Sequence, residues 1–128
     1  MQLLQTYRVS DCGQSILSAV CHQDRFFVSD AHTNSIKVFN KEGKFFYNIG
    51  SEGSGDGQLK HPIGLAIDKF NNLIVCVAGN GRLQIFRLDG MFVSKINCAG
   101  APYYIAVSRN GKLFVTELTE RCSVFVFQ

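Results

Sequence analysis

The sequence has no tryptophan, two prolines, and no apolar run long enough to cross a membrane as a helix. Residues 1–14 lack the apolar core of a secretory signal, and no Asn-x-Ser/Thr glycosylation site occurs. The net charge of +3 is too small to indicate a polyanionic partner by itself. These absences favour a soluble cytoplasmic protein, and we expect neither a membrane nor DNA as its partner.

Closely spaced cysteines are also lacking, although the chain has five cysteines. No two of them are separated by only two residues, which excludes a zinc ribbon and a thioredoxin-like redox pair. Their odd number and wide spacing indicate free thiols in a reducing compartment. The five are Cys12, Cys21, Cys76, Cys98 and Cys122.

Short apolar runs punctuated by turn residues are abundant. Runs of four to six residues rich in Val, Ile and Phe alternate with Gly, Asn and Asp. The turns NKEGK and RLDGM place glycine late, as short hairpins prefer. No window has convincing helical periodicity. The pattern predicts an all-β fold.

Three segments of the chain repeat one another, at residues 16–50, 61–97 and 101–128. Ala19, Ala66 and Ala106 align, at spacings of 47 and 40 residues. Four short strands per repeat are typical of a β-propeller blade, so we expect about three four-stranded blades. The third repeat stops after its third strand, and residues 3–9 are predicted to be the outer strand of a preceding or closing blade.

The second repeat carries the most specific motif. Gly57-Gln58-Leu59, Pro62, Gly64-Leu65-Ala66-Ile67-Asp68 and Arg82-Leu83-Gln84-Ile85-Phe86 stand in an ordered series within residues 50–90. This series resembles the NHL repeat. Nearly all of residues 16–128 are similar to the C-terminal propellers of tripartite-motif (TRIM-NHL) ubiquitin ligases and of Brain tumour-like translational repressors. The resemblance implies half of a probable six-bladed ring.

The repeats depart from the NHL pattern at a charged pair. The family pairs an Asp at the end of the second strand with an Arg at the start of the third. The first repeat has Asp30 but Ser35, and the second has Arg82 but Val77. An unpartnered buried charge is costly, so Asp30 and Arg82 either pair across neighbouring blades or find water.

Catalytic, metal and cofactor sites are not expected. Residues 53–57 are glycine-rich but lack the Gly-Lys-Ser/Thr ending of a phosphate loop, and no helix pattern follows them. His22, His32 and His61 lie in different kinds of connection and are expected to be exposed loop residues. No catalytic triad or pair of carboxylates is recognisable. We therefore expect this segment not to be an enzyme.

Binding is the remaining role, and the resemblance implies the surface. Loops from second to third strand and from blade to blade form one face, here called the loop face, on which Brain tumour-like propellers hold single-stranded RNA. It comprises residues 31–34, 50–61, 79–82, 97–104 and 118–121. Groups suited to contact RNA or protein there are His32, Lys60, His61, Arg82, Tyr103, Tyr104 and Arg121, with the tyrosines as stacking groups.

The formal charges favour the other side of the sheets, here called the opposite face. The loop face has a balance of −1 and the opposite face of +3. The charged residues of the opposite face are Arg25, Lys41, Lys44, Lys69, Arg87, Arg109 and Lys112 against Asp24, Glu42, Asp68 and Asp89. Because nucleic-acid affinity depends on phosphate neutralisation, this balance disfavours RNA on the loop face.

Three functions are consistent with the sequence. The first is a platform for a protein substrate or partner in a TRIM-NHL-like ubiquitin ligase. The second is single-stranded RNA binding in post-transcriptional repression. The third is structural, with two half-propellers pairing through their open edges to close a ring.

Overall fold

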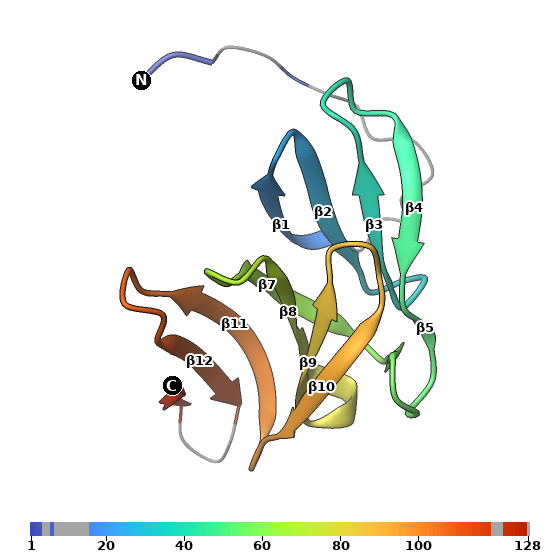
Figure 1. Cartoon of the computed structure of the whole chain (residues 1–128). Coiled ribbons are helices and arrows are strands. Elements are labelled where there is room, and N and C mark those ends of the chain that lie inside the picture. The colour runs from blue at the N-terminus through green and yellow to red at the C-terminus, as the bar shows by residue number, and fades with distance from the viewer. Residues whose placement is uncertain (4–5, 7–15, 119–121, 128) are drawn as a thin grey trace.

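The computed structural model describes residues 1–3, 6, 16–118 and 122–127. Its strands form three antiparallel sheets, which we call blades A, B and C (Figure 1). Blade A contains β1 (Ile16–His22), β2 (Arg25–Asp30), β3 (Ser35–Phe39) and β4 (Phe45–Ile49). Blade B contains β7 (Pro62–Ile67), β8 (Asn72–Val77), β9 (Arg82–Arg87) and β10 (Phe92–Asn97). Blade C contains β11 (Ala101–Val107), β12 (Leu113–Leu118) and β13 (Cys122–Phe127).

Two smaller elements lie in the connections around blade B. A parallel pair of two-residue strands, β5 (Ser51–Glu52) and β6 (Gln58–Leu59), lies in the connection from blade A to blade B. One turn of 3₁₀-helix, η1 (Ala78–Asn80), joins β8 to β9. The all-β prediction is therefore confirmed, with separate blades in place of one continuous sheet.

The hairpins inside the blades follow the predicted turn chemistry. In NKEGK and RLDGM the glycines Gly43 and Gly90 have φ of 81° and 99°. Their amides donate to the carbonyl oxygens of Asn40 and Arg87, both at 2.9 Å. Glycine adopts this left-handed conformation without steric cost, so each turn closes tightly and the next strand pairs back.

The blades pack face to face, and β7, the first strand of blade B, contacts both β1 and β11. Alternate residues of β8 serve different interfaces. Leu73, Val75 and Val77 belong to the core shared with blade A, whereas Ile74 and Cys76 belong to a second core that contains Val115 of blade C. All five are buried, because a strand between two blades has no solvent-exposed face.

Blade C has one face that no described residue covers. Tyr104 pairs with Thr116, and Phe114 pairs with both Ala106 and Val126, so these residues share a face. All of them are exposed, Tyr104 and Val126 to 55% each. In blade B the residues of β7, β8 and β9 are mostly buried, whereas the outer strand β10 is largely exposed.

The predicted outer strand at residues 3–9 lies mostly outside the described residues, so it stays a prediction. The three-stranded blade C agrees with the expectation that the third repeat ends at its third strand. Of the residues that the structure describes, none forms a helix long and apolar enough to span a membrane.

Candidate binding surface

Arg82, the first residue of β9, forms hydrogen bonds with the glycine-rich connection between blades A and B. Arg82 is 7% exposed and its guanidinium points at backbone oxygens of this connection. It donates to the carbonyl oxygens of Ser54 at 3.1 Å, Gly55 at 2.6 Å and Gln58 at 3.3 Å. Carbonyl oxygens thus accept from both Nη atoms of the buried Arg82 side chain, in place of the Asp that its repeat lacks. Its Nε is also buried and has no hydrogen-bond partner among the described residues.

Two further side chains of blade B hold the same loop. Gln84 is fully buried; its Oε1 accepts from the amide of Gly57 at 2.9 Å, and its Nε2 donates to the Gln58 carbonyl. Asn80 donates through Nδ2 to the Gly53 carbonyl at 3.0 Å. Gln84 was not among the functional residues predicted from sequence. Its signal was its position two residues after Arg82, which places both side chains on the same side of β9.

Hydrogen bonds also join the loop to its neighbours on both sides. The amide of His61 donates to Oδ1 of Asn34 in the β2–β3 turn at 2.8 Å. The amide of Gly79 donates to the Lys60 carbonyl at 2.9 Å, and the amide of Cys98 donates to the Gly81 carbonyl at 2.9 Å. The loop face is therefore continuous from blade A to the start of blade C.

Blade C contributes a buried carboxylate to this surface. Glu117 is 3% exposed, and its Oε2 accepts from the amide of Gly100 at 3.2 Å. The pKa of the Cys98 thiol is raised to about 12, mainly by burial and also by a hydrogen bond with Glu117. The Glu117 side chain thus fixes the connection from blade B to blade C, as Arg82 fixes the connection before it.

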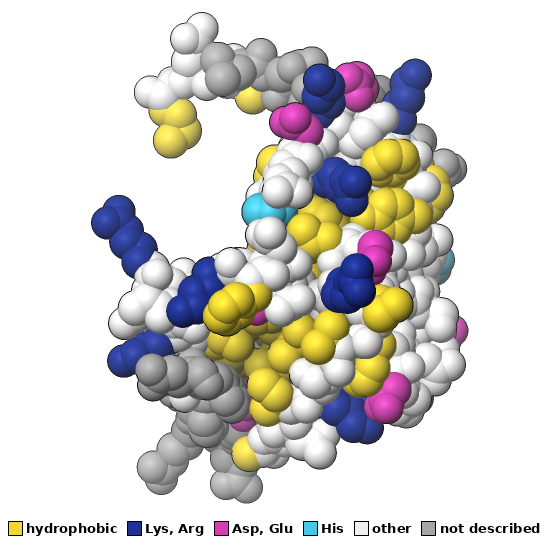
Figure 2. Space-filling model, viewed as in Figure 1, with side chains coloured by type: hydrophobic (Ala, Val, Ile, Leu, Met, Phe, Trp, Pro, Cys, Tyr) yellow, Lys and Arg dark blue, Asp and Glu magenta, His cyan; other side chains and the backbone are white. Residues whose placement is uncertain are grey.

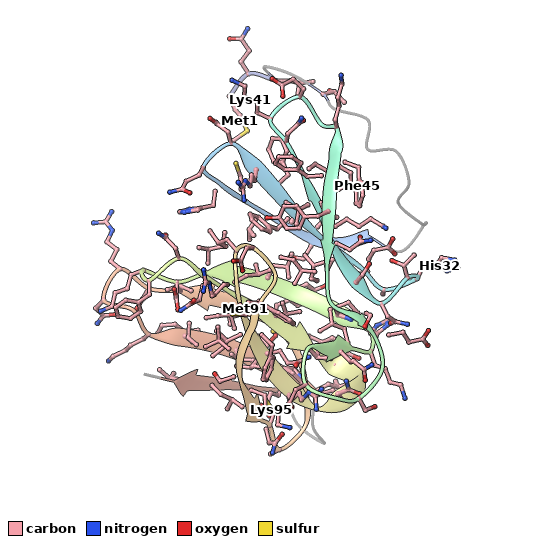
Figure 3. All side chains as sticks on the ribbon, turned by 45° about the vertical axis from the view of Figure 1, so that its right-hand side comes forward. Met1, His32, Lys41, Phe45, Met91 and Lys95 are labelled. Carbon is pink, nitrogen blue, oxygen red and sulfur yellow. The ribbon has the colours of Figure 1, made fainter. Side chains whose placement is uncertain are left out.

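The outer rim of the loop carries an ion pair. Lys95 Nζ lies 2.8 Å from Oδ1 of Asp56, and both side chains are substantially exposed. The hydrogen bond from Lys95 holds the pKa of the Asp56 carboxyl below its usual value. In Figure 3, Lys95 lies at the far end of β10 from Met91, on the loop-face side.

This arrangement of blades agrees with a comparison of the whole chain with protein families. A family model described as a 6-bladed beta-propeller (DUF5128) matches residues 4–123. The chain belongs to this family of 6-bladed β-propellers. The described residues form three blades of this kind.

Curated relatives are NHL-repeat proteins. Over 103 residues the propeller is 29% identical to the protein brain tumor of Drosophila melanogaster, covering 77% of this chain and 10% of the relative. It is 35% identical over 97 residues to the E3 ubiquitin-protein ligase TRIM71 of Mus musculus, covering 70% of this chain and 11% of that protein. The match to the protein lin-41 of Caenorhabditis elegans is 49% over 47 residues, or 37% of this chain and 4% of lin-41. The propeller spans about a tenth of the first two, and the resemblance to NHL proteins is confirmed.

Solved structures support the propeller fold alone. A putative exported protein of Bacteroides fragilis superposes with a TM-score of 0.75 at 20% identity, over 92% of this chain and 34% of that one. Virginiamycin B lyase from Staphylococcus aureus superposes with a TM-score of 0.66 at 12% identity, over 95% of this chain and 44% of the lyase. At these identities the likeness carries no activity across.

Three of the residues expected to meet a ligand lie close together on the surface of the propeller. His32, Lys60 and His61 are exposed, and the Asn34–His61 hydrogen bond joins their two loops. His61 has a φ of 50°, an uncommon value for a residue with a side chain, and its carbonyl accepts from the amide of Ala78 at 3.2 Å. Figure 3 shows His32 and Lys41 at different ends of blade A. His32 marks the loop face, and Lys41 marks the opposite face.

The other expected residues do not join this group. Arg82 is buried under the loop, so its assignment as a ligand-facing side chain is corrected to that of a loop-holding residue. Tyr104 is exposed, but on the open face of blade C and not among the loops. Tyr103 is half-buried at the bulge in β11. Arg121 lies outside the described residues.

Proposed function

We propose that the loop face binds a protein, and that this propeller segment is the substrate- or partner-recognition portion of a TRIM-NHL-like ubiquitin-protein ligase. The observation that carries the proposal is the set of hydrogen bonds that Arg82, Gln84 and Asn80 form with the backbone of the loop. A surface that is rigid before binding loses little conformational entropy when a partner docks.

The polarity of the loop face supports a protein partner. Among its described exposed side chains, Lys60 is the free cation, whereas Glu52 and Asp56 are anions and Asp56 is already paired with Lys95. Interfaces of non-obligate protein complexes contain many polar groups and about ten direct hydrogen bonds, so a nearly neutral polar surface suits a protein partner. A phosphate backbone would require more cations than this. The similarity to TRIM71, named a ubiquitin-protein ligase, supports the second half of the proposal.

The experiment compares two triple variants of the whole chain in affinity capture followed by quantitative mass spectrometry. His32→Ala/Lys60→Ala/His61→Ala alters the loop face, and Lys41→Ala/Lys44→Ala/Arg109→Ala alters the opposite face. We expect a partner that the first variant loses and the second retains. The purified partner should then bind the unaltered chain with micromolar or tighter affinity in calorimetry. Identical capture by both variants overturns the proposal.

RNA and ligase arms complete the test. Titration with a uridine-rich single-stranded RNA measures the affinity of the chain for the alternative ligand. If the chain binds this RNA in a salt-sensitive way and the loop-face variant does not, the ligand of the loop face is RNA and not a protein. The ligase assignment is tested on the transcript upstream of the Met1 codon. A RING, B-box and coiled coil are expected there, and a full-length transcript without a RING would remove the ligase role but leave the binding role.

The open face of blade C favours a second function, self-assembly. Phe114, Leu118 and Val126 are exposed to 37%, 52% and 55% on one sheet surface. A contiguous apolar face on a soluble chain marks an interaction site. The family has six blades and this chain forms three, so two copies supply the number that closes a ring around a two-fold axis.

A further inference from the structure

The opposite face carries a cleft that the proposed function does not use. It has a volume of about 470 Å³ and lies between the β1–β2 turn of blade A and the β7–β8 and β9–β10 turns of blade B. Its lining residues are Arg25, Phe70, Asn71, Asn72, Arg87 and Leu88, together with Asp89. Two arginines and an aromatic ring therefore line one opening on the side of the molecule that has the positive charge balance.

Arg25 is fixed in place within this cleft. Its Nη1 donates to the hydroxyl of Tyr47 at 3.0 Å, and that hydroxyl donates to the carbonyl oxygen of Leu88 at 2.6 Å. The guanidinium carbon also lies 5.5 Å from the centroid of the Phe46 ring. These contacts use one of the five N–H donors, so the planar group is oriented with donors left for a carboxylate.

A second, apolar pocket adjoins the cleft. It has a volume of about 210 Å³ and lies between blades B and C. Its aliphatic walls are Ile74, Ile85, Ile96 and Leu113, and Asp68, Lys69 and Gly111 also line it. Phe70 lines both cavities and is 73% exposed. Figure 2 shows hydrophobic side chains exposed beside Lys and Arg on this side of the molecule. An arginine-lined cleft and an aliphatic pocket thus share one aromatic wall.

We infer that these two adjoining cavities bind a linear acidic peptide, with a carboxylate at Arg25 and Arg87 and an aliphatic side chain in the pocket beyond Phe70. The charge complementarity selects an acidic ligand. The aliphatic walls select a ligand that has hydrocarbon side chains between its charges. The Asn71 side chain at the cleft supplies an amide group of the kind that binds peptide backbones, whereas Nδ2 of Asn72 already donates to the Asp68 carboxylate.

A nucleic acid fits the same cavities less well. Asp89 lines the cleft and forms an exposed pair with Arg87, at 3.3 Å between Nη2 and Oδ2. Asp68 lines the apolar pocket, and its carboxylate accepts from the amides of Phe70 and Asn72 at 2.8 and 2.9 Å. A phosphate backbone carries a charge at every unit and would meet both carboxylates, whereas a peptide can place its carboxylates apart from Asp68 and Asp89.

Fluorescence anisotropy on the whole chain tests this inference. The probe is a labelled peptide of about twelve residues in which Glu and Leu are spaced by Gly. The matched control peptide replaces each Glu by Gln. We expect a micromolar dissociation constant for the acidic peptide and at least about tenfold weaker binding of the Gln peptide. Equal binding of the two peptides would overturn the inference.

Variants locate the site. Arg25→Glu should weaken binding at least about tenfold, whereas Arg109→Glu, with the same charge change outside the cleft, should weaken it less than about threefold. Phe70→Ser removes an exposed ring, so it should leave the fold intact and also weaken binding. Equal effects of Arg25→Glu and Arg109→Glu, or tighter binding of a uridine oligonucleotide that Arg25→Glu abolishes, would contradict a peptide site. The loop-face triple variant serves as a further control and should bind the peptide unchanged, which separates this site from the proposed function.

Discussion

The guanidinium of Arg82 donates to the carbonyl oxygen of Gly55 at 2.6 Å, although the two residues are 27 positions apart. The contact links the first residue of β9 to the connection that enters blade B. Because Arg82 also reaches Ser54 and Gln58, one buried side chain sets the shape of a loop that contains four glycines between residues 50 and 57. Sequence alone would describe that loop as a flexible linker.

Replacing Arg82 by alanine should therefore destabilise the propeller. Three hydrogen bonds from a buried charge to carbonyl oxygens are lost, and of these oxygens the one of Gln58 still accepts from Nε2 of Gln84. We expect the free energy of unfolding to fall by about 2–4 kcal/mol. Urea denaturation followed by circular dichroism measures it.

Arg87→Ala is the matched control for Arg82→Ala. Arg87 is the last residue of the same strand, and its side chain is 59% exposed in a surface pair with Asp89. A surface pair contributes about 0–1 kcal/mol, so this variant should unfold close to the unaltered chain. Equal losses in the two variants would show that Arg82 does not hold the loop.

Gly64 lets the first strands of blades B and C approach closely. A Cβ at this position would lie 2.6 Å from the carbonyl oxygen of Tyr103 and 2.8 Å from the Cα of Tyr104. Both are backbone atoms that cannot rotate away, so β7 and β11 would have to separate. We expect Gly64→Ala to cost about 2 kcal/mol or more of stability.

A second glycine provides the comparison for Gly64. At Gly55 a Cβ would meet Oε1 of the Gln58 side chain at 2.9 Å, and this side chain can rotate away at the loss of its single hydrogen bond from the Gly55 amide. Gly55→Ala should cost less than about 1 kcal/mol. Thermal unfolding of both variants checks the difference, and a Gly64→Ala protein as stable as the unaltered chain would mean that the two strands are not in close contact.

The fold could be predicted from sequence because its determinants are local and repeated. Alternating apolar runs and the glycines at positions 43 and 90 predicted the hairpins, and the three aligned alanines predicted the number of blades. The structure adds β5 and β6, which are two residues each and have no periodicity to detect.

The candidate site was harder to predict because it depends on which way side chains point. Arg82 and Tyr104 were assigned to the ligand by their positions in the repeat. Burial beneath the loop redirects Arg82, and strand alternation places Tyr104 on the open face of blade C. The hydrogen bonds from Arg25 to Tyr47 and from Tyr47 to Leu88 join strands β2 and β4 of blade A to the β9–β10 turn of blade B. Because these residues are far apart in the sequence, no short motif could reveal the series.

The buried thiol of Cys76 should make stability depend on alkaline pH. Burial raises the pKa of Cys76 from 9.0 to about 12. Above pH 9 the unfolded chain releases this proton while the folded chain keeps it, so folding stability is full below pH 9 and falls as the pH rises towards 12. We expect Cys76 to contribute a loss of about 1 kcal/mol per pH unit in this window. Cys98, whose pKa is also raised to about 12, adds to the slope, so Cys76→Ala should show a shallower slope and not a flat one.

Alkylation supplies an independent measurement of the same thiol. Cys21 is exposed and Cys76 is fully buried. Iodoacetamide at pH 8 should therefore label Cys21 in the native chain and reach Cys76 only in urea, as mapped by peptide mass spectrometry. Rapid native labelling of Cys76 would indicate that the interface between blades B and C opens readily.

The open face of blade C gives the sharpest test of self-assembly. Leu118 is 52% exposed there, at the end of β12, and a charge at its position would have to be buried if a second copy docked. We expect the unaltered chain at about 50 µM to elute as a dimer in light scattering and Leu118→Lys to elute as a monomer. Val93→Lys is the control, because Val93 is 49% exposed on the outer strand β10 of blade B, away from this face. A monomeric unaltered chain would contradict closure of a ring by two copies. Loss of the dimer in both variants would contradict it too, because closure requires the apolar face of blade C and does not involve the outer strand of blade B.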